Sequence, residues 1–180
     1  ENRIIGSGTI LDTARLRSRL SEYYNINQSN VHAYVFGEHG DSSFIPWSVA
    51  NISNVPIKEC KKLITTPGIN APELDFGEIE QYVRKSGARV IARKGATFYA
   101  VSVSVCHICK CLLGGIDTTM TVSTMMHGEY GIEDVALSTL NMVGHNGVRG
   151  KVNVPMTDEE VTLLRKSADT LKDVISNLEI

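Results

Sequence analysis

Two strand-like runs, at about 118–126 and 135–143, follow one another with a single short polar segment between them. So short a connection joins antiparallel neighbours, because parallel strands need a crossover of a dozen or more residues. Helical patterns stand on either side, at about 97–113 and 158–178. The sequence therefore predicts an α+β fold with helices packed on an antiparallel sheet.

The two flanking helices differ in pattern. Thr157 and Glu160 have the spacing of a capping box at the start of the last helix. Residues 97–113 are apolar on nearly every side, which predicts a buried helix. Their β-branched content would also suit a strand, but the length and the lack of flanking turn signals favour a helix.

The first half of the chain predicts a mixture of helices and strands. The predicted elements are a helix over 10–24 with Thr9 as its cap, strands over 31–36 and 44–49, a short helix between Pro56 and Pro67, and a helix over 75–93. A tight polar loop, Gly37-Glu38-His39-Gly40-Asp41-Ser42, separates the two strands.

Composition excludes several classes of protein. Hydrophobic residues make up 42% of the 180 residues, yet no apolar run approaches the ~18 residues of a membrane span. A formal net charge of −2 argues against a nucleic acid or an anionic membrane as partner. No signal peptide is visible and the four cysteines form no disulfide scaffold, so we expect a cytoplasmic protein. The length fits one domain over 1–180.

Two motifs resemble ligand sites but lack required residues. Gly6-Ser7-Gly8 has the start of a dinucleotide fingerprint, but Leu11 stands where the third glycine is needed. Cys106, Cys109 and Cys111 crowd together with His107 between them, but no second cysteine pair completes a zinc site. We therefore predict buried thiols and no metal.

A third group of residues carries chemistry. Asp12 lies on the same helical stripe as Leu16 and Leu20, so its carboxylate faces the interior and needs a partner. His39, in a glycine-flanked loop, is the obvious partner, and Arg15 is a neighbour of Asp12 on the helix. A surface Asp–Arg pair and a histidine in an ordinary turn are the alternatives.

Together the three residues form a candidate site for proton transfer. A carboxylate that accepts one imidazole N–H orients the ring and favours its protonated form, so the other nitrogen can exchange a proton near neutral pH. The planar fork of Arg15 matches a carboxylate. The implied substrate is a small hydroxy or oxo acid.

Several segments resemble the C-terminal, substrate-binding half of the lactate/malate dehydrogenase family. They are Gly6-Ser7-Gly8-Thr9, Leu11-Asp12-Thr13-Ala14-Arg15, the loop 37–42, Lys94-Gly95-Ala96-Thr97, Gly128-Glu129-Tyr130-Gly131-Ile132, Asn146-Gly147 and the closing helix. The resemblance spans essentially the whole chain. It implies reversible reduction of pyruvate to L-lactate with NADH, and it implies that the dinucleotide-binding (Rossmann) half is absent from this chain.

The resemblance also implies residue roles. His39 would be the proton donor and acceptor, next to the cofactor, with Asp12 as its partner. Arg15 would bind the substrate carboxylate, Thr97 would line the substrate pocket and Val101 would pack on the nicotinamide ring of NAD.

A second set of residues resembles an effector site. Arg17 and His32 match the pair that binds fructose 1,6-bisphosphate in allosteric bacterial members of the family, across a subunit interface. A fixed and a titratable cation suit a phosphate, so the match implies an activated homotetramer. A surface arginine and a strand histidine without this role are the alternative.

Some positions depart from the family pattern and leave alternatives open. Gly87 is smaller than the usual alanine, Arg89 replaces a common acidic residue and Leu140 stands near a usual proline. The rivals are an L-2-hydroxyisocaproate or malate dehydrogenase, a hydrolase that uses Ser42 or Ser43, and a sugar-bisphosphate-binding module without catalysis. The hydrolase lacks a nucleophile elbow. We expect the chain alone to be inactive, because it cannot hold the cofactor.

Overall fold

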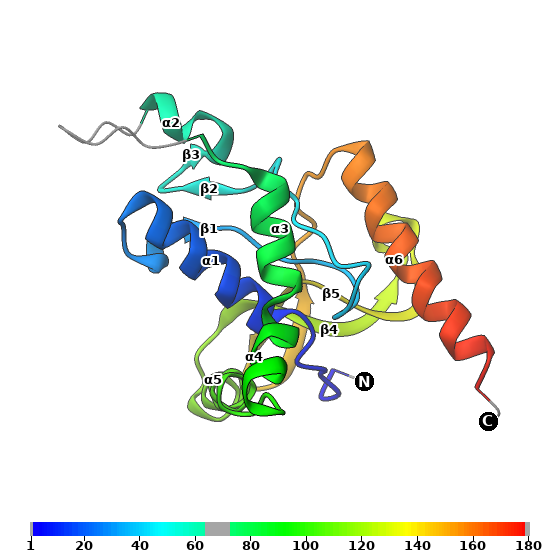
Figure 1. Cartoon of the computed structure of the whole chain (residues 1–180). Helices are drawn as coiled ribbons and strands as arrows, with labels where there is room; N and C mark the ends of the chain where they lie inside the picture. Colours follow the sequence, from blue (N-terminus) through cyan, green and yellow to red (C-terminus); the bar gives the residue numbers. More distant parts are fainter. Residues whose placement is uncertain (1, 64–72, 179–180) are drawn as a thin grey trace.

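The computed structural model describes residues 2–63 and 73–178, and its centre is a three-stranded antiparallel sheet (Figure 1). The strands are β4 (Thr118–His127), β5 (Glu133–Gly144) and β6 (Gly147–Lys151), in the order β4-β5-β6. Ser123 of β4 lies opposite Ser138 of β5. The predicted antiparallel pair is confirmed. The short, glycine-rich β6 carries no alternating apolar pattern and was not predicted.

A second, smaller sheet consists of β1 (Val31–His32), β2 (Asn51–Ile52) and β3 (Val55–Pro56), in that order. The predicted strand over 31–36 is therefore too long, and the one over 44–49 is wrong. Beyond β1, the backbone of Val35 bonds to the side chains of Thr9 and Thr13, at the start of the first helix, rather than to a strand. After a single bridge at Phe44, the chain turns at Pro46, whose carbonyl accepts the N–H of Val49.

The helices surround these two sheets. They are α1 (Ile10–Tyr24), η1 (Gln28–Asn30), η2 (Ile57–Glu59), α2 (Cys60–Leu63), α3 (Phe76–Arg84), α4 (Ser86–Lys94), α5 (Tyr99–Gly114), η3 (Glu129–Gly131) and α6 (Asp158–Ser176). The prediction of α1 is confirmed, and so is the capping box of α6. The predicted helix between Pro56 and Pro67 begins as η2 and α2, and its remainder lies outside the described residues.

The predicted single helix over 75–93 is wrong, because it consists of two helices. α3 ends at Arg84, and α4 begins at Ser86. At the junction, the Ser86 hydroxyl donates to the carbonyl of Tyr82, which competes with the regular helical bond. The split matters because α4 then has an orientation of its own, and its residues line the cavity described in the next subsection.

The prediction that α5 is buried all round is also wrong. Its buried residues are Ser104, Ile108 and Cys111, whereas Val103 is 69% exposed. Cys106 and Cys109 are exposed as well, so the prediction of buried thiols holds only for Cys111. The described residues cover α5 mainly on one side, where it packs on α1 and β5. None of the described helices is long and apolar enough to cross a bilayer.

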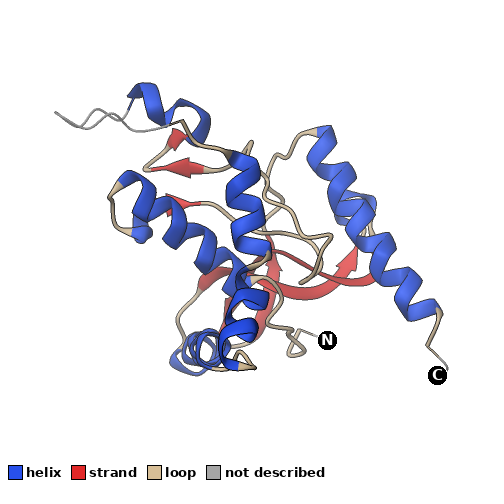
Figure 2. Ribbon diagram, viewed as in Figure 1, coloured by secondary structure: helices blue, strands red, loops and turns tan. Residues whose placement is uncertain are grey.

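Figure 2 shows how the helices lie around the strands. The buried apolar side chains between them form separate clusters. Leu16 and Leu20 of α1 pack over the small sheet. Leu164 of α6 packs with Leu137 of β5 and with Phe36. The segment that continues from Phe36 therefore runs between α6 and the large sheet, close to the start of α1.

Candidate active site

Buried hydrogen bonds tie the start of α1 to the segment 35–37. Thr9 stands at the predicted N-cap position of α1, but its side chain makes no capping bond, because its hydroxyl donates to the Val35 carbonyl at 2.5 Å instead. The Val35 N–H in turn donates to the Thr13 hydroxyl at 2.9 Å. Ser138 of β5 serves both segments: its hydroxyl accepts the Thr9 N–H at 3.1 Å, and its carbonyl accepts the Gly37 N–H at 2.9 Å.

This framework brings His39 onto Asp12. The imidazole Nδ1 donates to Asp12 Oδ2 at 2.6 Å, although 27 residues separate the two in the chain. The Asp12 side chain is 9% exposed and that of His39 is 62% exposed. The hydrogen bond with Asp12 raises the pKa of His39 above its ordinary value, and partial desolvation opposes this rise. His39 Nε2 is left to exchange a proton with another molecule.

Arg15 completes the group from the next turn of α1. Its Nη1 donates to the other oxygen of Asp12, Oδ1, at 3.1 Å. Asp12 thus holds the imidazole and the guanidinium with its two oxygens. The bond uses one of the five N–H donors of Arg15, so the rest of the fork remains for an anionic ligand.

A cavity of about 370 Å³ joins these residues to those predicted from later in the chain. Asp12, Arg15, His39, Thr97 and Val101 all line it. Further lining residues, which the sequence did not predict, lie on α3, α4 and α5, namely Arg84, Ala88, Ile91 and Ser104. No local pattern marks these residues, because only the packing of the three helices brings them to α1.

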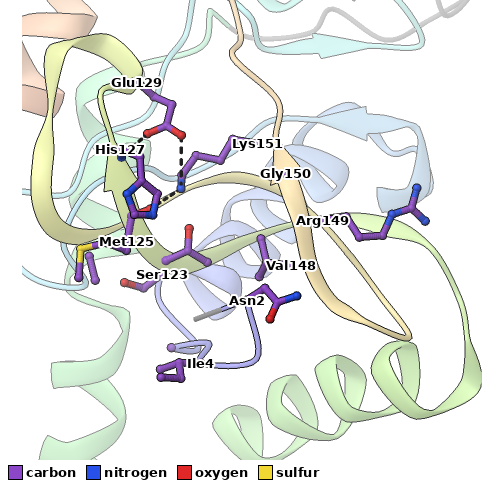
Figure 3. A pocket seen from close by; sticks show the side chains of 13 residues that line it. Asn2, Ile4, Ser123, Met125, His127, Glu129, Val148, Arg149, Gly150 and Lys151 are labelled. Atoms are coloured by element: carbon purple, nitrogen blue, oxygen red, sulfur yellow. Dashed lines mark hydrogen bonds and ion pairs between the residues drawn. The ribbon is translucent and has the colours of Figure 1, made fainter.

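A larger cavity of about 500 Å³ lies between the chain start and the large sheet (Figure 3). Its charged groups are already paired: Lys151 Nζ lies 3.7 Å from Glu129 and donates to the Met125 carbonyl at 2.5 Å. Neither Asp12 nor His39 lines it. The smaller cavity is therefore the candidate active site.

The predicted effector residues lie apart from this site. Arg17 Nε donates to the Ala33 carbonyl at 3.0 Å, and Arg17 Cζ lies 5.0 Å from the ring centroid of Tyr34. Burial lowers the pKa of Arg17. A cavity of about 350 Å³ includes Arg17, whereas His32 is exposed on β1 and does not line that cavity.

The serines proposed as nucleophiles are not paired with His39. Ser42 Oγ donates to the carboxylate of Glu38, and Ser43 Oγ donates to the Gly40 carbonyl at 2.8 Å. A serine nucleophile needs its base within hydrogen-bond reach. The hydrolase hypothesis therefore has no support in the geometry.

The fold consists of helices packed on antiparallel sheets. At an open cavity, a carboxylate and a guanidinium from one helix meet an imidazole, an arrangement suited to acid–base chemistry beside an anion-binding group. Residues 9–179 match the family model described as the lactate/malate dehydrogenase α/β C-terminal domain. The chain belongs to the lactate/malate dehydrogenase family, as its sequence predicts, and corresponds to the C-terminal domain of that family.

Individual relatives support this assignment. An L-lactate dehydrogenase of Acetivibrio thermocellus is 41% identical over 100% of this chain and 56% of its own length. An L-lactate dehydrogenase 2 of Clostridium acetobutylicum is 40% identical over 99% of this chain and 54% of its own length.

Solved structures agree. An L-lactate dehydrogenase from Clostridium thermocellum has a TM-score of 0.87 at 38% identity, covering 98% of this chain and 56% of its own. A minor L-lactate dehydrogenase of Enterococcus mundtii has a TM-score of 0.90 at 30% identity, covering 99% and 56%. The chain thus spans a little over half the length of the relatives that it matches.

Proposed function

We propose that this chain is the substrate-binding part of an NAD-dependent L-lactate dehydrogenase, folded as one domain over 1–180. The contact of 2.6 Å between Asp12 and His39, beside Arg15 on a common cavity, is the observation that carries the proposal. The relatives named L-lactate dehydrogenase support the choice of substrate.

The residues of this chain supply the proton and hold the substrate. Arg15 binds the carboxylate of pyruvate through its fork, which places the neighbouring carbonyl oxygen toward His39. Protonated His39 donates its Nε2 proton to that oxygen as the carbonyl carbon is reduced, and it recovers a proton from lactate in the reverse direction. Asp12 stabilises the imidazolium before the transfer.

The cavity has a surface that suits the nicotinamide part of NAD. Val101 and Ile91 line it together with His39, so an apolar wall stands beside the proton donor. NADH, when bound, supplies the hydride. The relatives are nearly twice as long as this chain, so we assign most of the NAD contacts to the part of the enzyme outside it.

The similarity to L-lactate dehydrogenases also supports proposals about the location, the assembly and the effector of the enzyme. We propose that the enzyme is cytoplasmic and homotetrameric, and that Arg17 and His32 contribute to a site for fructose 1,6-bisphosphate. The partial burial of Arg17 beside a cavity supports its part in this site, whereas His32 supplies only an exposed imidazole. A chain that only binds the sugar bisphosphate would not need the Asp12–His39 pair.

A specific observation favours a second candidate substrate. A Cβ added at Gly87 would meet no atom within 4 Å, so the cavity has open space at α4. Such space suits a 2-oxo acid with a side chain larger than that of pyruvate, as in an L-2-hydroxyisocaproate dehydrogenase.

Steady-state rates of the complete enzyme on pyruvate, oxaloacetate and 4-methyl-2-oxopentanoate test these assignments. We expect reduction of pyruvate by NADH, with a turnover about 10²- to 10⁴-fold lower in His39→Asn. A His39→Asn enzyme with the wild-type rate would refute the assignment. We expect no NADH oxidation by the isolated 180-residue chain, and measurable oxidation would contradict its dependence on the cofactor domain.

A further inference from the structure

A second hydrogen-bonded group holds the loop that carries His39, on the side away from α1. It joins Glu38 and Ser42, which flank His39 in the loop 37–42, to Ser167 of α6. The Glu38 N–H donates to Ser167 Oγ at 2.8 Å, and Ser167 Oγ lies 2.9 Å from Ser42 Oγ. Ser42 Oγ donates to the Glu38 carboxylate.

The available protons fix the direction of every bond. A carboxylate only accepts, so the single proton of the Ser42 hydroxyl goes to Glu38. Ser167 therefore donates its own proton to Ser42 and accepts the backbone N–H of Glu38. The three bonds form a closed ring that starts and ends at Glu38. Every hydroxyl in this ring donates once and accepts once, so the removal of either hydroxyl opens it.

Ser167 is a fixed point for this ring. Its side chain is fully buried, and its neighbours Leu164 and Ala168 pack in the core between α6 and β5. A Cβ at Gly37 would lie 2.6 Å from Ser167 Oγ, so α6 and the loop backbone are in close contact here. In Figure 1, α6 is the orange and red helix. A residue about 130 positions away in the chain thus contacts the backbone next to His39.

We propose that Ser167 is a positioning residue, which keeps His39 on Asp12 through the ring with Ser42 and Glu38. The inference rests on the proposed function only for its effect on turnover. When the ring opens, the loop gains freedom and the 2.6 Å contact between His39 and Asp12 forms less often. Since that contact raises the pKa of His39, the pKa falls toward its ordinary value and a smaller fraction of the imidazole is protonated.

The test compares Ser167→Ala, Ser42→Ala and the double variant in the complete enzyme. We expect kcat for pyruvate reduction to fall about 10- to 100-fold in each single variant, because misplaced catalytic groups cost this much. KM should change less, since Arg15 is untouched. The basic limb of the kcat–pH profile should move to lower pH. The double variant should be no worse than either single variant, because one opening already breaks the ring.

Ser48→Ala is the matched control. Ser48 Oγ donates to the Glu160 carboxylate of α6. Like Ser42, Ser48 lies between β1 and β2, so this change also removes a serine bond to α6, but one outside the ring. It should leave kcat and its pH profile unchanged. Wild-type kcat and pH profile in Ser167→Ala, or additive losses in the double variant, would overturn the proposal. If Ser167→Ala does not fold, Ser42→Ala and Ser167→Cys decide by the same criteria.

An NMR titration of His39 separates this inference from the proposed function. The imidazole signals, assigned with His39→Asn, should show a lower pKa in Ser167→Ala than in the wild type. If the wild type does not reduce pyruvate, the proposed function fails, and the titration still tests the ring. An unchanged His39 pKa would refute the positioning role whatever the activity.

Discussion

The substitution Asp12→Asn removes the charge from the contact that defines the site. Asparagine keeps the size of the side chain and one oxygen that can accept the His39 N–H, but it removes the negative charge and the second acceptor, which faces Arg15. Asp12 Oδ2 lies 2.6 Å from His39 Nδ1 and Oδ1 lies 3.1 Å from Arg15 Nη1, so both partners lose a charge-assisted bond. Desolvation still lowers the pKa of His39 in the variant, and the Asp12 charge no longer opposes it.

The expected magnitude follows from the geometry. A hydrogen bond between charged groups contributes about 1.5–3 kcal/mol. The His39 side chain is 62% exposed, so solvent screens the interaction and the lower limit, about 1.5 kcal/mol, applies. This corresponds to about a tenfold loss in kcat/KM. The loss should be greater above neutral pH than at pH 6, because the reduction needs protonated His39 and the variant loses its proton at lower pH.

Two measurements check this prediction: the pH dependence of kcat/KM for pyruvate reduction, and the NMR titration of His39. Asp41→Asn is the control, since it makes the same chemical change at an exposed carboxylate that lines the cavity without bonding to His39. An Asp12→Asn enzyme whose His39 keeps the wild-type pKa would show that the carboxylate charge does not set the state of the imidazole.

Three further predictions concern stability. The folded-state pKa of His39 is raised, so its contribution to stability is fully present below the unfolded pKa near 6.5 and disappears as the pH rises through the folded pKa. His39→Gln should therefore be more destabilising in urea at pH 6 than at pH 9. An equal effect at both pH values would contradict this. Gly8→Ala should lower the free energy of unfolding by roughly 1–3 kcal/mol, because Gly8 has φ +51° and the new Cβ would lie 2.2 Å from Ser138 Oγ. Gly87→Ala, in open space within α4, should instead raise it by up to about 1 kcal/mol in the same urea titration. Thr157→Ala should cost about 1 kcal/mol by thermal denaturation through loss of the capping box of α6, and an unchanged melting temperature would show that the cap does not limit stability.

Local patterns in the sequence determined the elements whose stabilising contacts lie nearby in the chain. Four-residue apolar spacing gave α1 and placed Asp12 on its inner face, and two strand-like runs on either side of a short polar segment gave β4 and β5. These predictions succeeded because helix and strand periodicities are local properties. The wrong predictions came where distant groups decide the outcome, as at Val35, whose backbone bonds to the side chains of Thr9 and Thr13 at the start of α1.

The sequence by itself determined which residues form the proposed acid–base group, since an aspartate on an apolar stripe must find a partner and a glycine-flanked histidine can reach one. Only the tertiary structure decided how they meet. The large sheet aligns α1 with the histidine loop through Ser138, α4 turns Gly87 toward the cavity, and Ser167 of α6 holds the loop from behind. These contacts join residues far apart in the chain, and their geometry depends on how whole elements pack, which no local pattern encodes.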